Sequence, residues 1–173
     1  MKRTLLLASV LASALASGSA FATASASATF AGACSGASFD ASGSDIEYFD
    51  LNLDLVKGGS KECVITTTIP GTPGLAIHIS SFKAEAFADI TNGGIATLLV
   101  NHRITGQNEI ASRAIAHETG DLVAEQQTVG RTKCGQAIEL RTKLTVKAVK
   151  AILLQDSATS NTVTYKIDYT PCH

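Results

Sequence analysis

Tryptophan is absent from this 173-residue sequence, and only three tyrosines and six phenylalanines supply aromatic rings. Glycosidases and sugar-binding modules often use aromatic side chains as platforms for sugar rings, so this shortage weakens both readings without excluding either. No stretch behind the N-terminal segment supplies about eighteen consecutive apolar residues, and the sequence therefore predicts no membrane span.

Several motifs that carry chemistry are also missing. There is no G-x-S-x-G nucleophile motif, and neither H-x-H nor H-E-x-x-H spacing places two histidines on one face. A zinc site would need closely spaced cysteines, which the sequence lacks. Nothing repeats at a fixed period, which argues against a solenoid or a propeller. We therefore expect no cofactor.

The N-terminus has the three regions of a secretory signal peptide. Lys2 and Arg3 give a basic start, an apolar run extends from Leu5 to about Leu15, and small residues end in Ala20-Phe21-Ala22. This layout predicts cleavage after Ala22, so that residues 1–22 are the signal peptide. The protein is then expected to be secreted, into either a periplasm or the extracellular medium.

Residues 23–173 are long enough for one domain of ordinary size. Residues 23–33 are small and nearly uncharged, which predicts a flexible leader before a single domain at 34–173. Removing residues 1–22 leaves twelve basic against fifteen acidic residues, a formal net charge of −3. Because nucleic-acid binders need a concentrated basic patch, we expect no nucleic-acid partner.

All four cysteines, Cys34, Cys63, Cys134 and Cys172, follow the predicted signal peptide. An even number of cysteines in an exported chain indicates disulfides, because the compartment outside the cytoplasm is oxidising. Three pairings are possible. We favour Cys34 with Cys63 and Cys134 with Cys172, since Cys134 opens and Cys172 closes what reads as a final antiparallel strand pair.

Alternation of apolar and polar residues predicts an all-β fold. It is clearest at 46–55, 63–69, 75–90, 95–104, 137–149 and 162–169, with turns at 57–60, 70–74, 92–94 and 156–161. Residues 110–117 and 123–128 are compatible with strand or short helix. About eight or nine strands with short turns favour an antiparallel, jelly-roll-like β-sandwich.

Two groups of residues could hold a metal ion. His102 and His117, with Glu118 or Asp121, could supply imidazole and carboxylate ligands if their strands lie close together. Asp50, Asn52 and Asp54 could form an oxygen-rich stripe for calcium. For both groups we favour a solvated sheet surface. His78 is expected on the outer face of its strand and His173 at a mobile end, and we assign no catalytic, metal or cofactor-binding residue.

The order of several short features resembles a family of small secreted four-cysteine domains of unknown function from fungal and bacterial secretomes. Those features are the first cysteine, Phe49-Asp50-Leu51-Asn52, Lys61-Glu62-Cys63, Pro73-Gly74-Leu75, Asn92-Gly93, Thr105-Gly106-Gln107, Cys134-Gly135, Asp156-Ser157 and a tyrosine-rich strand ending at Cys172. Where the family usually has a glycine near an aromatic residue, this chain has Ala86-Phe87-Ala88. The resemblance implies a secreted β-sandwich with two disulfides and implies no activity.

The leading functional hypothesis is a non-enzymatic exported domain that binds an unknown protein or glycan at the cell surface. Two alternatives stay open. One is a subunit of a surface fibre or adhesive assembly, joined through an exposed sheet edge. The other is a metal-dependent hydrolase that uses His102, His117 and nearby acids.

Overall fold

The computed structural model describes residues 26–154 and 161–172, and every regular element in these ranges is a β-strand. None of the described residues belongs to a helix that could span a membrane. The strands are β1 (Ser27–Gly32), β2 (Ser38–Ser42), β3 (Asp45–Phe49), β4 (Gly59–Ile69), β5 (Leu75–Ile104), β6 (Ile110–Ala116), β7 (Gly120–Arg131), β8 (Ile138–Leu154) and β9 (Asn161–Pro171).

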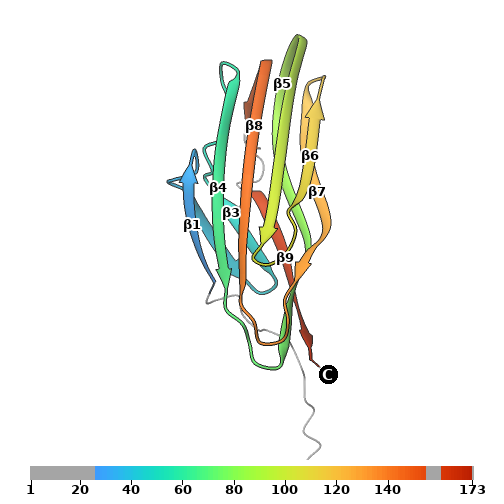
Figure 1. The fold of residues 1–173 in the computed structure, drawn as a ribbon. Coiled ribbons are helices and arrows are strands. Elements are labelled where there is room, and N and C mark those ends of the chain that lie inside the picture. The colour runs from blue at the N-terminus through green and yellow to red at the C-terminus, as the bar shows by residue number, and fades with distance from the viewer. Residues whose placement is uncertain (1–25, 155–160, 173) are drawn as a thin grey trace, which may run out of the picture.

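All strand pairs are antiparallel and belong to one sheet that folds over on itself. One layer, called layer A, contains β1, β4, β8, the second half of β5, and β6; the other, layer B, contains β2, β3, β9, the first half of β5, and β7. Figure 1 shows β4, β8 and part of β5 side by side, with β9 behind them. The predicted antiparallel β-sandwich is confirmed, and the two segments left open between strand and short helix lie in strands β6 and β7.

Strand β5 connects the two layers. Its register against β8 shifts between Ile90 and Ile95, where Gly93 has φ +71° and Lys150 of β8 also has positive φ. A side chain at Gly94 would come within 2.2 Å of the Lys150 carbonyl oxygen, so the two backbones touch there. The turn predicted at 92–94 is thus a fold-over inside one long strand, and not a hairpin between two strands.

The two halves of β5 face each other across the core. The ring centroids of Phe82, in the first half, and His102, in the second, lie 4.1 Å apart. Inward-facing alanines, Ala84, Ala86, Ala88 and Ala96, line this strand near the fold-over. Because these side chains are small, the two layers approach closely there, and larger residues fill the remaining interior.

Both disulfides are present, Cys34–Cys63 and Cys134–Cys172, in the pairing favoured from the sequence. The expected final strand pair is wrong, because β5 lies between β8 and β9. The first lies in the core beside β1 and β4. The second ties the segment between β7 and β8 to the end of β9. The first bridge therefore joins the residues after β1 to β4, and the second joins the residues before β8 to those after β9.

The flexible leader predicted at 23–33 is wrong for residues 27–32, which form strand β1. This strand pairs with β4 along its whole length, from Ser27 opposite Thr68 to Gly32 opposite Cys63. The ring of Phe30 packs edge-on against Tyr48 in the core. Ordering a small-residue segment is possible here because hydrogen bonds from β4 and the adjacent disulfide hold it. Residues 1–25, including the predicted signal peptide and cleavage site, lie outside the described residues, as do His173 and most of the predicted turn at 156–161.

The strand predicted at 46–55 ends at Phe49. Beyond it, Asp50 and Asn52 have φ of 55° and 50°, values in the left-handed region that strand residues do not adopt. The leucines at 51, 53 and 55 are nevertheless buried, as their alternation predicts. The backbone of this segment is therefore not extended. Left-handed residues alternate with the leucines, and every second side chain is buried.

Candidate functional site

The interior contains two hydrogen-bonded polar groups that bridge the layers. The first joins the Tyr48 hydroxyl on β3 to the Thr67 hydroxyl on β4, at 2.5 Å. Both side chains are fully buried. Burial raises the pKa of Tyr48, against the smaller opposing effect of the Thr67 hydrogen bond, so this phenol stays protonated. The contact holds the layers in register and is closed to solvent.

The second group is centred on Tyr165 of β9. Its hydroxyl lies 2.6 Å from Nδ1 of His102 and 2.6 Å from Oγ1 of Thr142. Nε2 of His102 is buried with no hydrogen-bond partner among the described residues. Burial lowers the pKa of His102 to about 4, because protonation would place a charge among apolar side chains. His102 is therefore neutral at pH 7.

The predicted proximity of His102 and His117 is wrong. In the β5–β6 register His102 lies opposite Ile110, whereas Ala116, the residue before His117, lies opposite Ala96. Six residues of extended strand separate these levels, about 20 Å at the usual rise per residue. His117 is exposed, with Glu118, in the β6–β7 connection, so these residues do not form one metal site.

The favoured reading of His102 as a solvated residue is also wrong, since its side chain is only 1% exposed. The sequence did contain a signal for burial. His102 has the same parity along the strand as Leu98, Val100 and Ile104, all of which face the core. His78 is half-buried between two fully buried isoleucines, which agrees with the outer position expected for it.

The oxygen-rich stripe at residues 50–54 does not lie along one strand face. Asp50 and Asn52 occupy the irregular segment after β3, and the Lys61 ammonium donates to the Asn52 backbone carbonyl at 2.8 Å and to its Oδ1 at 3.3 Å. A cation of the protein itself thus uses the Asn52 oxygens of this stripe. No group of three or more His, Cys, Asp or Glu suited to a metal ion occurs within 26–154 and 161–172.

The outer surfaces of the two layers carry opposite charge. The outer surface of layer A, the basic face, has five basic and two acidic side chains among the described residues: Arg103, Arg113, Arg141, Lys143 and Lys147 against Glu62 and Glu139. The outer surface of layer B, the acidic face, has three basic and eight acidic side chains when His78 is not counted. The basic residues are Lys83, Arg131 and Lys166, and the acidic residues are Asp40, Asp45, Glu47, Glu85, Asp89, Asp121, Glu125 and Asp168.

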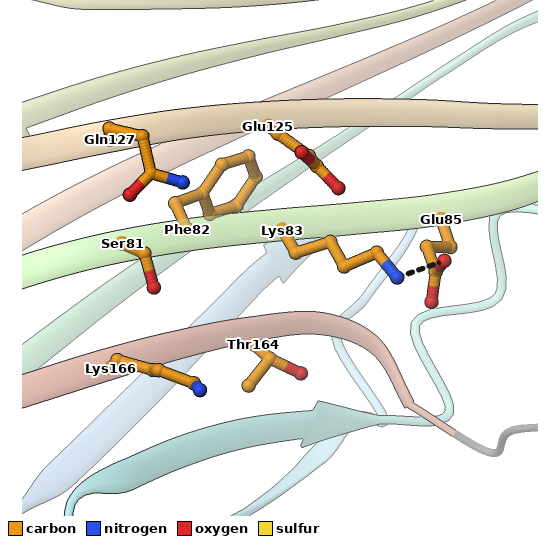
Figure 2. Close-up of a pocket in the computed structure, with 8 residues that line it drawn as sticks. All are labelled: Ser81, Phe82, Lys83, Glu85, Glu125, Gln127, Thr164 and Lys166. Atoms are coloured by element: carbon orange, nitrogen blue, oxygen red, sulfur yellow. Dashed lines mark ion pairs between the residues drawn. The ribbon is translucent and has the colours of Figure 1, made fainter.

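A shallow hollow of about 350 Å³ lies on the acidic face over β9, β5 and β7. Figure 2 shows its lining, in which the Lys83 ammonium pairs with the Glu85 carboxylate at 2.5 Å. The hydrogen bond to Glu85 raises the pKa of Lys83. Lys166 lies opposite Asp45 in the strand register. The cations of this hollow therefore have acidic neighbours.

A second hollow, the basic trough, lies on the basic face over the second half of β5. It has a volume of about 280 Å³ and is lined by Thr97, Leu99, Arg113, Thr145 and Lys147. Leu99 is directly opposite Arg113 on β6 and Thr145 on β8, so short side chains form the floor between longer ones. Two cations and two hydroxyls line this trough, and none of its lining residues is acidic.

No protein-family model matches the sequence, and no curated protein matches it. Among solved structures, the chain is similar to the carbohydrate-binding module TmCBM61 in complex with beta-1,4-galactotriose, at 9% identity and a TM-score of 0.33, covering 84% of this chain and 88% of that one. It is also similar to the enzymatically active domain of bacteriophage CBA120 tailspike protein 4, at 10% identity and a TM-score of 0.26, covering 87% of this chain and 20% of that one. At these values neither likeness establishes a relationship.

Proposed function

We propose that this protein is an exported, non-enzymatic domain that binds a protein or glycan partner at the cell surface or in the extracellular medium. The observation that carries the proposal is the position of the polar and charged side chains in the fold. The buried hydroxyls of Tyr48, Thr67, Thr142 and Tyr165 bond to one another across the layers, whereas charged and hydroxyl side chains gather in hollows on the outer faces. A rigid sandwich with such faces suits binding better than catalysis.

The two disulfides support the location. They form and persist in oxidising compartments, which agrees with the signal peptide predicted at residues 1–22. The resemblance to secreted four-cysteine domains is part of the same proposal. Whether the protein stays in a periplasm or leaves the cell is decided by fractionation of cells that express the full chain.

The test is a binding assay on protein exported from its full-length chain and purified in oxidised form. The protein is incubated with envelope fractions, with soluble glycans and with extracellular medium, and its melting temperature is followed, because a ligand of the native state raises that temperature. The proposal expects a saturable shift with one class of material. Saturable turnover of a substrate would contradict it.

A fibre subunit is the alternative that one observation favours. Among the described residues, β1 pairs only with β4 and β2 only with β3, so each leaves one edge unpaired. Such an edge could accept a strand from a neighbouring molecule. Light scattering after size-exclusion chromatography tests this hypothesis, since a monomer at high protein concentration contradicts it.

A further inference from the structure

We propose that the basic face binds a linear polysaccharide that carries carboxylate groups, with the basic trough as its central subsite. This inference rests on the proposed function and names the partner class for one face. Composition alone does not predict this face, because its cations come from three strands, β5, β6 and β8. Folding gathers five of them on one surface of a chain whose predicted secreted part is net acidic.

The cations form an elongated row. On β8, Arg141, Lys143 and Lys147 point outward from alternate positions, over a length of about 20 Å at the strand rise. Arg113 on β6 and Arg103 on β5 lie beside this row. A row of this shape matches charges repeated along an extended chain better than it matches a single small anion.

Acidic side chains of the same face neutralise only part of the row among the described residues. Lys143 has an acidic partner, with its ammonium 2.8 Å from Glu62. Arg103 and Arg141, by contrast, lie directly opposite each other on neighbouring strands. Like charges in that position destabilise a sheet. An anion placed between two guanidinium groups would remove the repulsion and accept hydrogen bonds from both.

The neutral residues of the face indicate the rest of the ligand. Thr66, Thr97 and Thr145 present hydroxyls among the cations, and each hydroxyl can both donate and accept a hydrogen bond. A polymer that carries hydroxyls as well as carboxylates would use both kinds of group. An acidic polysaccharide has this combination.

Three other occupants fit less well. The described residues of the basic face include no aromatic side chain on which nucleic-acid bases could stack. An acidic peptide would offer carboxylates to the cations but only its backbone amide groups to the threonine hydroxyls. A second copy would have to place its acidic face against the cations, yet the hollow of that face is lined by as many cations, Lys83 and Lys166, as carboxylates, Glu85 and Glu125, and offers the row no net negative charge.

The test uses oligogalacturonate as the probe and its fully methyl-esterified form as the neutral control, with oxidised, exported full-chain protein in isothermal titration calorimetry. We expect saturable binding of the charged oligomer, with no detectable binding of the ester. Affinity should fall steeply as salt increases, because ionic contacts are screened. Arg113→Glu/Lys147→Glu should weaken binding at least about tenfold through two reversed charges at the trough.

The matched control is Lys83→Glu/Lys166→Glu, which makes the same change in net charge on the opposite face. It should alter affinity by less than about twofold, because its sites lie outside the row. Circular dichroism first establishes that both variants fold. Equal weakening by the two variants would show that only net charge matters, and would overturn the proposal.

Other arms identify other occupants. If polyglutamate or a single-stranded oligonucleotide binds as tightly as oligogalacturonate or more tightly, the assignment to a polysaccharide is overturned. Salt-sensitive self-association that Arg113→Glu/Lys147→Glu abolishes would overturn it as well. If oligogalacturonate fails while envelope material still raises the melting temperature, this inference is wrong and the proposed binding function stands. If neither binds, both are wrong.

Discussion

The basic and acidic faces are made from the same kind of strand, and β5 contributes one half to each. On the basic face, Arg103 and Arg141 lie directly opposite each other, whereas on the acidic face Lys83 is paired with Glu85. One surface thus keeps unneutralised charge at some cost in stability, and the other compensates its cations locally. Unneutralised cations on the basic face are what the proposed binding of an anionic partner to that face would require.

The fold-over of β5 creates the two faces, and Gly94→Val should disrupt it with the largest effect on stability. Because the added Cβ would meet the Lys150 carbonyl oxygen at 2.2 Å, backbone on both strands must move. We expect a loss of at least about 3 kcal/mol in the free energy of unfolding, measured by urea denaturation.

The matched control for this variant is Gly93→Ala. Nothing lies within 4 Å of the Cβ position there, so only its positive φ opposes the substitution. The cost should be about 1 kcal/mol. Equal losses for the two variants would show that close approach of β5 and β8 is not what fixes the fold-over.

His102 lies in the core that separates the faces and should make stability depend on pH. Its folded pKa of about 4 is below the ordinary value of 6.5. The unfolded chain therefore binds a proton that the folded protein does not bind between these values. The contribution is fully present above pH 6.5 and is lost as pH falls toward 4, by about 3 kcal/mol.

His102→Gln removes this titration, so the variant should lose less stability than the parent between pH 6.5 and 4. Urea denaturation at several pH values measures both. Carboxylates titrate in the same range in both proteins, and their effect cancels in the difference. Parallel curves would show that folding does not lower the pKa of His102.

Tyr48→Phe should cost about 1 to 2 kcal/mol, because it leaves the buried Thr67 hydroxyl without its phenol partner. Thermal denaturation measures the loss. Adding Thr67→Val removes the second polar group, so the double variant should be more stable than Tyr48→Phe alone. A double variant less stable than the single one would contradict a direct pairing of the two hydroxyls.

Arg141→Thr should give the smallest effect and the opposite sign. Removing one of two facing guanidinium groups should raise stability by about 0.2 to 1 kcal/mol, while oligogalacturonate binding weakens. Lys143→Thr is the comparison, since it removes an ion pair with Glu62 and should not raise stability. Lower stability of Arg141→Thr would mean that the two arginines do not repel each other.

Alternation in the sequence predicted the sandwich and the burial of Leu51, Leu53 and Leu55, and the even number of cysteines behind the predicted signal peptide predicted two disulfides. It failed for β1, whose order depends on pairing with β4 and on packing of Phe30 against Tyr48. Composition describes a segment alone, whereas these contacts are made with distant residues.

The candidate site was beyond sequence reasoning for the same reason. The outward positions of Arg141, Lys143 and Lys147 follow from alternation in β8, but their meeting with Arg103 and Arg113 depends on register between strands. The error over His102 and His117 has this origin as well, because β5 and β6 are neighbouring strands, yet His102 on β5 and His117 just after β6 lie at different levels. Alternation within one strand shows which of its residues share a face of the sheet. The register between strands is needed to show which residues of other strands lie beside them.

The central claim is that the basic face is the binding surface. The most direct measurement is an amide chemical-shift titration of the isotopically labelled, exported protein with oligogalacturonate. The account predicts that the changes concentrate at residues 97–103 of β5, 111–115 of β6 and 141–147 of β8, while β7 and β9 stay unchanged. Changes concentrated on β7 and β9, or no changes at all, would contradict it.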